Sequence, residues 1–343
     1  MNILIFGASY GMLLGSKFLK SGHDVHFIAL KNEVDLINSE GFSVSIIKRP
    51  TNENIIITSK ELDGKLTSST PEEKIDLKKF DLVFLAMQEF QYSDKKITDI
   101  IINIGILKIP TVSVMNIPPY TYLKNFSNVP LNSCRQAYQS LKIWDKFDKN
   151  YLSTSSPDPQ AFRPQDKKMN FLQVRLASNF KVAEFGDNKS NAILYQLEND
   201  IKKLRIPVYL NIVKTKFIIM AKWPMLICGN YRCVKNDKIM SIYEAVNENK
   251  DLSERIYNDV VKLCLKLGAD TKTMVPFKHY FKRTKQLDAP SSVARAIDNK
   301  KINIERFDKL LEIISLENDF KIENLDIITK VIDNRLEKIL NTI

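Results

Sequence analysis

Residues 2–22, NILIFGASYGMLLGSKFLKSG, decide how the first part of the chain folds. The apolar run NILIF predicts a buried strand, and MLLGSKFLKSG has the spacing of an amphipathic helix that ends near Gly22. Between them lies a glycine-rich turn with Gly7, Gly11 and Gly15. Such a turn can bind phosphate, because the free N–H groups at a helix N-terminus attract anions.

The turn is one residue shorter than the dinucleotide fingerprint G-x-G-x-x-G. Gly7 would shape the tight turn, and Gly11 would let backbone pass close to a diphosphate or to the next helical turn. Ser9 stands where the middle glycine would be, and its hydroxyl could donate to phosphate. We therefore predict a dinucleotide site that includes Gly7, Ser9, Tyr10 and Gly11, with a purely structural turn as the alternative.

Apolar strands alternate with helical segments over the first 210 residues, which predicts βαβ units and a parallel sheet. Two later runs, NFLQVRLA and FKVAEFG, suggest a β-hairpin, and the polar, proline-rich STSSPDPQAFRPQDKK suggests a loop or an inserted flap. The other predicted elements are the strands HDVHFIAL, FDLVFLAM, PTVSVMN and PVYLNI and the helix SNAILYQLENDIKKLRI.

The second part of the chain has a different pattern. Segments from VKTKFIIMAKWPMLIC to NLDIITKVIDNRLEKILNTI repeat apolar residues at spacings of three and four, which predicts one helix after another. We expect an α/β fold with two domains. Residues 1–210 would form a doubly wound, Rossmann-type coenzyme domain, and residues 211–343 an all-α domain for substrate binding or dimerisation.

The end of the second predicted strand, FIALKNE, bears on the choice of coenzyme. An acidic residue there would bind the ribose hydroxyls of NAD, whereas a cation suits the 2′-phosphate of NADP. Lys31 comes first and Glu33 follows it, so the sequence favours NADP. The alternative is that Lys31 is an exposed loop lysine.

The composition argues against several other classes of protein. The formal net charge is +11, but acidic residues are interspersed among the lysines and no basic stripe with aromatic residues is present, so a nucleic-acid partner is not expected. The four cysteines form no CxxC pair and the three histidines have no ligand spacing, which predicts reduced thiols and no metal site. Reduced thiols are typical of a cytoplasmic protein, which we expect here. No apolar run is long enough for a membrane helix.

Several short motifs resemble the ketopantoate reductase (2-dehydropantoate 2-reductase) family, whose members use NADPH and have a Rossmann domain followed by a helical domain. The motifs are MNILIFGASYG…SGHDVHFIA, DLVFLAMQEFQYSD and VSVMN. The resemblance places Gln88 where the family usually has lysine, in the coenzyme-binding loop. It places Asn116 on the asparagine beside the nicotinamide, although Ile117 replaces the glycine that follows.

The best match is MAKWPMLICGN. Lys222 falls on the family's catalytic lysine and Asn230 on the second of two asparagines, while Leu226 replaces the first. Farther along, APSSVARAIDNKKINIERF resembles the family's substrate-binding segment. There, Ser291 or Ser292 would match the substrate-binding serine and Glu305 the substrate-binding glutamate.

These residue types suit the reduction of a ketone. The nicotinamide supplies a hydride, and the protein supplies a proton and holds the substrate. The resemblance implies Lys222 as proton donor, with Asn116 and Glu305 completing the catalytic set. Each residue also has an ordinary structural alternative: a lysine whose stem covers apolar surface, an asparagine in a turn, and an exposed helical glutamate. For Asn230 the alternative is a residue at a helix end.

The resemblance implies NADPH-dependent reduction of a small, ketopantoate-like 2-keto acid, a reaction of pantothenate biosynthesis. Two other functions stay open: an opine-type dehydrogenase acting on another keto acid, and a non-catalytic NADP-binding sensor with the same fold. Arg135 and Arg163 could contact an acidic or larger substrate, or they could be surface residues. The C-terminal helices could also support a homodimer.

Overall fold

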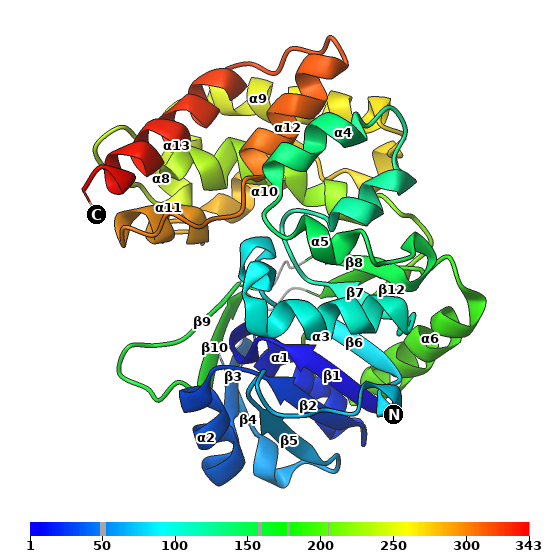
Figure 1. Ribbon diagram of the computed structural model, residues 1–343. Helices are drawn as coiled ribbons and strands as arrows, with labels where there is room; N and C mark the ends of the chain where they lie inside the picture. The colour runs from blue at the N-terminus through cyan, green and yellow to red at the C-terminus, as the bar shows by residue number, and fades with distance from the viewer. Residues whose placement is uncertain (49–52, 157–159, 177–178, 205, 343) are drawn as a thin grey trace. The chain divides into compact units, whose positions relative to one another are not determined.

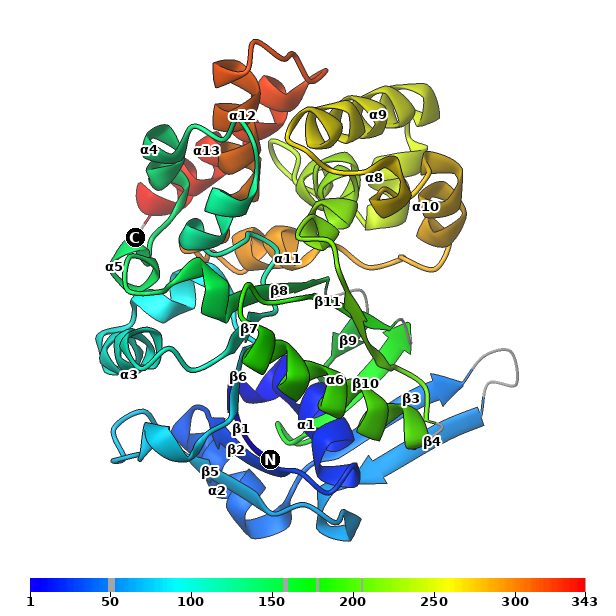
Figure 2. The ribbon, with the colours of Figure 1, turned by 90° about the vertical axis from the view of Figure 1, so that its right-hand side faces the viewer.

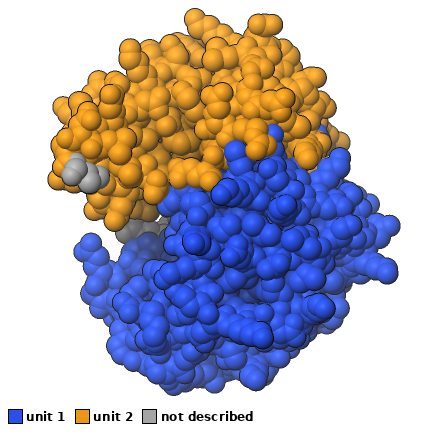
Figure 3. Space-filling view, in the orientation of Figure 1, with its two compact units in different colours: residues 1–122, 140–218 blue, residues 123–139, 219–343 orange. Residues whose placement is uncertain are grey.

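The computed structural model describes residues 1–48, 53–156, 160–176, 179–204 and 206–342. The chain folds into two compact units, which are coloured separately in Figure 3. The first, called the sheet unit here, contains residues 1–122 and 140–218. The second, the helical unit, contains residues 123–139 and 219–343. The predicted boundary near residue 210 did not anticipate that residues 123–139 join the helical unit.

An eight-stranded sheet forms the centre of the sheet unit (Figure 1). Its strands lie in the order β12 (Leu210–Val213), β11 (Phe180–Ala183), β8 (Leu152–Ser156), β7 (Thr111–Ser113), β6 (Leu82–Leu85), β1 (Asn2–Phe6), β2 (Asp24–Ile28) and β5 (Leu66–Ser69). Neighbouring strands from β5 to β8 run parallel, and only the β8–β11 pair is antiparallel. Strands β1 and β6 are buried almost throughout, as expected for parallel strands covered on both faces.

A second, four-stranded sheet belongs to the same unit. Its order is β4 (Glu53–Thr58), β3 (Ser43–Lys48), β10 (Phe171–Leu176) and β9 (Gln160–Phe162). Helix α1 (Ala8–Lys20) packs against strands of both sheets and against α6 (Asn188–Lys203), which also contacts β12 (Figure 2). The remaining helices of this unit are α2 (Lys31–Glu40), α3 (Lys95–Ile106) and α5 (Leu141–Trp144).

Two local predictions in this unit are wrong. Strands β10 and β11 do not form a hairpin, because β10 pairs with β3 and β9 while β11 pairs with β8 and β12. An alternating pattern identifies a strand but not its partner. The stretch expected to be a loop begins with strand β8, whose hydroxyl side chains are buried, and it also contains β9. Residues 157–159 of that stretch lie outside the described residues.

The helical unit contains α4 (Leu131–Cys134), α7 (Trp223–Met225), α8 (Ile242–Asn247), α9 (Lys250–Lys266), α10 (Phe277–Thr284), α11 (Ser292–Asp298), α12 (Phe307–Glu317) and α13 (Leu325–Leu340). Helix α12 begins at Phe307, so Glu305 precedes it and is not the helical residue that the spacing suggested. The predicted fold class, a parallel α/β sheet followed by helices, is confirmed.

Candidate functional site

Gly7 is the single residue between strand β1 and helix α1. Its φ of +92° is one that side-chain-bearing residues rarely adopt. A Cβ at this position would lie 2.5 Å from Met87 Cγ and 3.0 Å from the Ala86 carbonyl oxygen. The end of β1 and the segment after β6 therefore approach each other at a point where only glycine fits.

The strand order reverses at this same place. From β1 the chain proceeds outward to β2 on one side, and it returns to place β6 on the other side. Open α/β sheets bind ligands at such a switch point, outside the carboxyl ends of the strands. Gly7 lies there.

The N-terminus of α1 is suited to an anion. The helix has no acidic residue in its first turn, and Gly7 offers no side-chain cap. Ser9 is exposed, and the half-buried Tyr10 ring packs edge-on against Phe180 with a centroid distance of 5.9 Å. The helix dipole and the N-terminal N–H groups would favour a phosphate at this end.

Gly11 has a packing role. A Cβ on this residue would lie 2.7 Å from Ile5 Cγ2 and 3.0 Å from the Phe27 ring, so the glycine lets α1 approach β1 and β2. Gly15 makes a similar approach to Phe27 one turn later. The packing accounts for both glycines, and coenzyme binding by Gly11 stays a prediction.

Gln88 and Asn116 follow neighbouring parallel strands at the same edge of the sheet. Leu85 pairs with Ser113, and each candidate lies three residues past its member of that pair. Both side chains are half-buried. Amide groups at this edge could bind polar groups of a ligand.

The loop after β6 is held by buried polar contacts that the sequence did not indicate. The Tyr92 hydroxyl accepts from the Met87 N–H at 2.9 Å. The buried Glu89 carboxylate accepts from Ser140 N at 2.8 Å and from Trp144 Nε1 at 3.1 Å. These contacts fix the backbone on both sides of Gln88.

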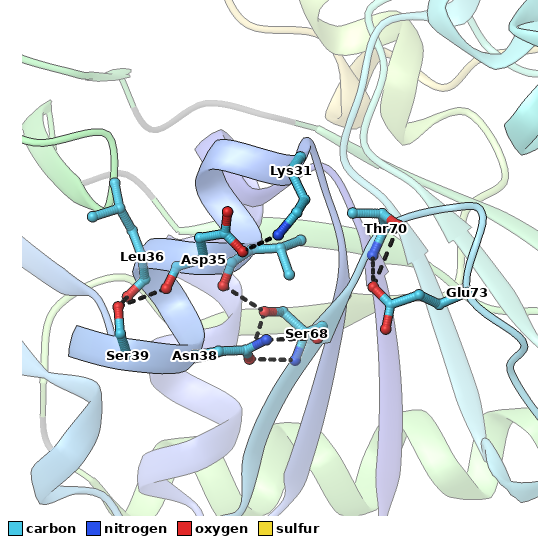
Figure 4. A network of polar contacts seen from close by, with 9 residues as sticks. Lys31, Asp35, Leu36, Asn38, Ser39, Ser68, Thr70 and Glu73 are labelled. Atoms are coloured by element: carbon cyan, nitrogen blue, oxygen red, sulfur yellow. Dashed lines mark hydrogen bonds and ion pairs between the residues drawn. The ribbon is translucent and has the colours of Figure 1, made fainter.

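Lys31 begins helix α2 instead of extending the second strand. Figure 4 shows its exposed ammonium group paired with Asp35, one helical turn later. Glu33 is buried: its Oε2 accepts from Leu30 N at 3.0 Å, and its Oε1 lies 2.5 Å from Arg163 Nη2. Arg163, which we considered as a substrate contact, is therefore engaged with Glu33, a pairing between residues far apart in sequence.

In the helical unit, Lys222 and Asn230 lie on one irregular helical segment. A 3-10 turn ends at Lys222, α7 follows with Pro224 in its first turn, and a π-helical turn spans Leu226–Asn230. Proline removes a backbone N–H, which accounts for the break at the lysine. Lys222 is 5% exposed. Single π turns occur often at functional sites.

Other candidate residues of the helical unit meet at the end of this segment. Ser291 caps α11 and donates to the Asn230 carbonyl oxygen at 2.6 Å, while Ser292 is the first residue of that helix. The Tyr231 hydroxyl donates to the Glu305 carbonyl oxygen at 2.5 Å and accepts from Phe307 N at 3.0 Å. Tyr231, which the sequence did not single out, thus fixes the backbone around Glu305.

Buried charge surrounds this cluster. Glu305 is 2% exposed. Arg306 Nε and Nη2 donate to the buried Asp308 carboxylate at 3.1 and 2.9 Å. Burial raises the pKa of Asp308, an effect that Arg306 opposes, and burial also raises the pKa of Tyr231 well above its usual value. Tyr231 therefore acts as a neutral hydrogen-bonding group.

The sequence predicted neither a metal site nor a membrane helix. Among the described residues, no three His, Cys, Asp or Glu side chains are grouped so that they could hold a metal ion. The helices in the described part of the chain include none long and apolar enough to cross a membrane.

With this geometry established, comparison with known proteins identifies a family. Residues 3–103 match the family model described as ketopantoate reductase PanE/ApbA. Over this segment the chain is similar to the ketopantoate reductase family. The resemblance predicted from the sequence motifs is confirmed there. No curated protein matches the chain in sequence.

Solved structures extend the likeness to nearly the whole chain. D-mandelate dehydrogenase, solved with NADH and anilino(oxo)acetate, has a TM-score of 0.69 at 14% identity, covering 99% of this chain and 100% of that chain. The PanE/ApbA family ketopantoate reductase from Ralstonia eutropha JMP134 has a TM-score of 0.65 at 11% identity, with coverage of 99% and 100%. The 2-dehydropantoate 2-reductase from Geobacter metallireducens GS-15 has a TM-score of 0.68 at 14% identity, with coverage of 97% and 99%. The chain thus has the fold that ketopantoate reductases and D-mandelate dehydrogenase share.

Proposed function

We propose that this protein reduces a small 2-keto acid to the 2-hydroxy acid with NADPH as hydride donor. The observation that carries the proposal is the Gly7 turn at the strand-order switch, where a Cβ would collide with Met87 and Ala86. The family match over residues 3–103 includes this turn. D-mandelate dehydrogenase, which shares the fold, was solved with NADH and a keto-acid-like ligand, which supports the same class of reaction.

In this proposal the coenzyme binds along the carboxyl edge of the sheet. The N-terminus of α1, with Gly7, Ser9 and Tyr10, holds the diphosphate. The half-buried Gln88 and Asn116 side chains, which follow the neighbouring strands β6 and β7, hold the nicotinamide half through hydrogen bonds. The bound nicotinamide supplies the hydride.

The preference for NADPH rests on how Glu33 is engaged. The acid that could bind ribose hydroxyls is instead bonded to Leu30 N and paired with Arg163. Lys31 remains exposed, and its surface ion pair with Asp35 is of a weak kind that a 2′-phosphate can replace.

The candidate residues of the helical unit act on the substrate. The Lys222 ammonium group donates a proton to the carbonyl oxygen, and its charge stabilises the alkoxide that develops there. Glu305 completes the catalytic set. Asn230, Ser291 and Ser292 hold the substrate by hydrogen bonds. The identity of the keto acid, a role in pantothenate biosynthesis, a cytoplasmic location and a homodimer all stay predictions.

A coenzyme and substrate screen tests the proposal. The full chain is titrated with NADPH and NADH, and then mixed with NADPH and a panel of aliphatic, branched and aromatic 2-keto acids. We expect tighter binding of NADPH and its oxidation by at least one acid of the panel. Failure to bind either coenzyme would overturn the proposal. Binding without oxidation would favour the sensor, and oxidation only when an amine is also present would favour an opine-type dehydrogenase.

A further inference from the structure

A hollow of about 410 Å³ lies wholly within the helical unit. It is lined by Tyr231, Arg232, Val234 and Lys235, by the connection from α8 into the start of α9, and by Asn324 with the first half of α13. Its volume is within the range of small-molecule sites, about 300–1,000 Å³. Lys222, Asn230, Ser291 and Glu305 are not among its lining residues. It is therefore separate from the substrate residues proposed above.

Arg232 brings a positive charge to this hollow. The side chain is only 8% exposed, and its Nη1 donates to the Cys228 carbonyl oxygen at 3.1 Å and to Ser253 Oγ at 2.7 Å. The Arg232 side chain also hydrogen-bonds the buried Cys228 thiol, and the hydrogen bonds to oxygen among the residues that the structure describes are those of Nη1. Within those residues, no carboxylate lies within 4 Å of the guanidinium. A buried cation without a counter-ion is costly, and a bound anion would offset that cost.

Glu248, the acidic residue among the described lining residues of the hollow, is hydrogen-bonded to Lys235. The Glu248 carboxylate accepts from Lys235 Nζ at 2.8 Å, and this bond, aided by the charge of Arg232, lowers the pKa of Glu248. The lining therefore has two cationic side chains, Arg232 and Lys235, and one carboxylate, Glu248, which is hydrogen-bonded to Lys235. The lining thus carries one net positive charge, which we assign to Arg232.

Part of the lining is apolar. It contains Leu252 from α9 and Ile327 and Ile328 from α13. Ile327 is 55% exposed, although it is a large aliphatic side chain. A ligand that covered it would gain from burial of apolar surface.

We propose that this hollow binds a small organic anion, with its carboxylate or phosphate on Arg232 Nε and Nη2 and its apolar group on Ile327. The anchored Nη1 holds the guanidinium in one orientation, so its remaining donors form a fixed pair for two anion oxygens. The site needs neither the coenzyme nor the reductase activity.

Calorimetric titration of the full chain with benzoate, phenyl phosphate and neutral benzamide tests this site. We expect one or both anions to bind, and benzamide to bind about tenfold or more weakly, as the loss of a charged hydrogen-bonding pair implies. The relative affinity of benzoate and phenyl phosphate tells which anionic group the site prefers. Equal binding of benzamide, or binding of none of the three probes, would overturn the proposal.

Three variants locate the binding. Arg232→Met keeps much of the stem's packing and should weaken anion binding about tenfold or more. Arg255→Met removes an exposed charge on α9, which pairs with Glu323, and should leave binding unchanged. Ile327→Ser, at an exposed position, should weaken benzoate but not acetate. The proposal fails if Arg255→Met loses as much affinity as Arg232→Met, or if Ile327→Ser has no effect on benzoate. If the Arg232→Met protein does not fold, the benzoate affinity of the Ile327→Ser protein still tests the proposal.

Discussion

The two units place their candidate residues on different kinds of structure. In the sheet unit, Gly7, Gln88 and Asn116 follow regular parallel strands at one edge of a sheet. In the helical unit, Lys222 and Asn230 lie on a segment that changes from 3-10 to α to π geometry, and Glu305 lies outside any helix.

The candidate residues of the two units are held in position in different ways. At the sheet edge, strand register sets the backbone, and a change of backbone shape should do the most damage. In the irregular segment, tertiary contacts set the backbone: a Cβ on Gly229 would lie 2.1 Å from the Tyr280 hydroxyl oxygen. There, the chemistry of individual side chains should matter most.

The largest effect is expected at Lys222. Lys222→Met should lower kcat about 10²–10⁴-fold, because it removes the proton donor, and should leave the dissociation constant of NADPH unchanged. Steady-state kinetics and coenzyme titration measure the two quantities. Lys262→Met, at an exposed lysine of α9, is the control and should keep full activity. A wild-type kcat in the Lys222→Met protein would show that Lys222 is not the proton donor.

The next effect tests the backbone at the sheet edge. Gly7→Ala should cost about 2–5 kcal/mol of stability, because it combines a strained φ with a collision against Met87 and Ala86, and it should weaken NADPH binding. Gly22→Ala is a matched control: its φ is +76°, but a Cβ there meets nothing within 4 Å. Denaturant unfolding of both variants separates strain from collision, and equal losses would contradict the close approach at Gly7.

The sheet unit contains a buried lysine, whose pKa makes the stability of the protein depend on pH. Lys17 on α1 is 2% exposed and donates to the Pro207 carbonyl oxygen at 2.5 Å. Burial, with a smaller contribution from Lys20, lowers its pKa to about 7. In the unfolded chain the Lys17 amine has its ordinary pKa of 10.5. Between about pH 7 and pH 10.5 folding therefore releases the Lys17 proton, and the free energy of unfolding rises with pH.

Relative to Lys17→Met, the wild type should therefore gain about 2 kcal/mol between pH 7 and 9, with most of the lysine's cost present at pH 7 and below. Urea unfolding of both proteins across this range measures the difference. A pH-independent difference between the two proteins would show that Lys17 is charged in the folded state.

The smallest effect concerns coenzyme choice. Arg163→Met should release Glu33 from its ion pair, and we expect the preference for NADPH over NADH to fall about fivefold. Lys167→Met, in the same connection between β9 and β10, is the control. An unchanged ratio of the two dissociation constants would show that the Glu33–Arg163 pair has no part in specificity.

The sequence predicted the start of the main sheet well, but strands β3 and β4 of the second sheet were not among the predicted elements. Strand β1, helix α1 and strand β2 follow hydrophobic periodicity, and the pattern gave both their type and their order. Strand β8 was missed because four of its five residues, LSTSS, are polar. The Ser153 hydroxyl is buried and donates to the Ala183 carbonyl oxygen at 2.5 Å, a partner that lies in another strand.

The candidate site was predictable only where it follows regular elements. Gly7 and Asn116 were indicated by their places after apolar strands. The contacts that position the other candidates join distant residues, as in Arg163 with Glu33 or Tyr231 with the backbone at Glu305. No periodic pattern encodes such contacts, and local spacing wrongly put Glu305 on a helix.

The most direct test of the central claim follows the hydride itself. The protein is mixed with NADPH that carries deuterium in the transferable position of nicotinamide C4, together with the most reactive 2-keto acid of the panel, and the product is examined by mass spectrometry and NMR. We expect a 2-hydroxy acid that carries the deuterium on C2. A protein that binds NADPH tightly but transfers no deuterium to any keto acid of the panel would contradict this expectation.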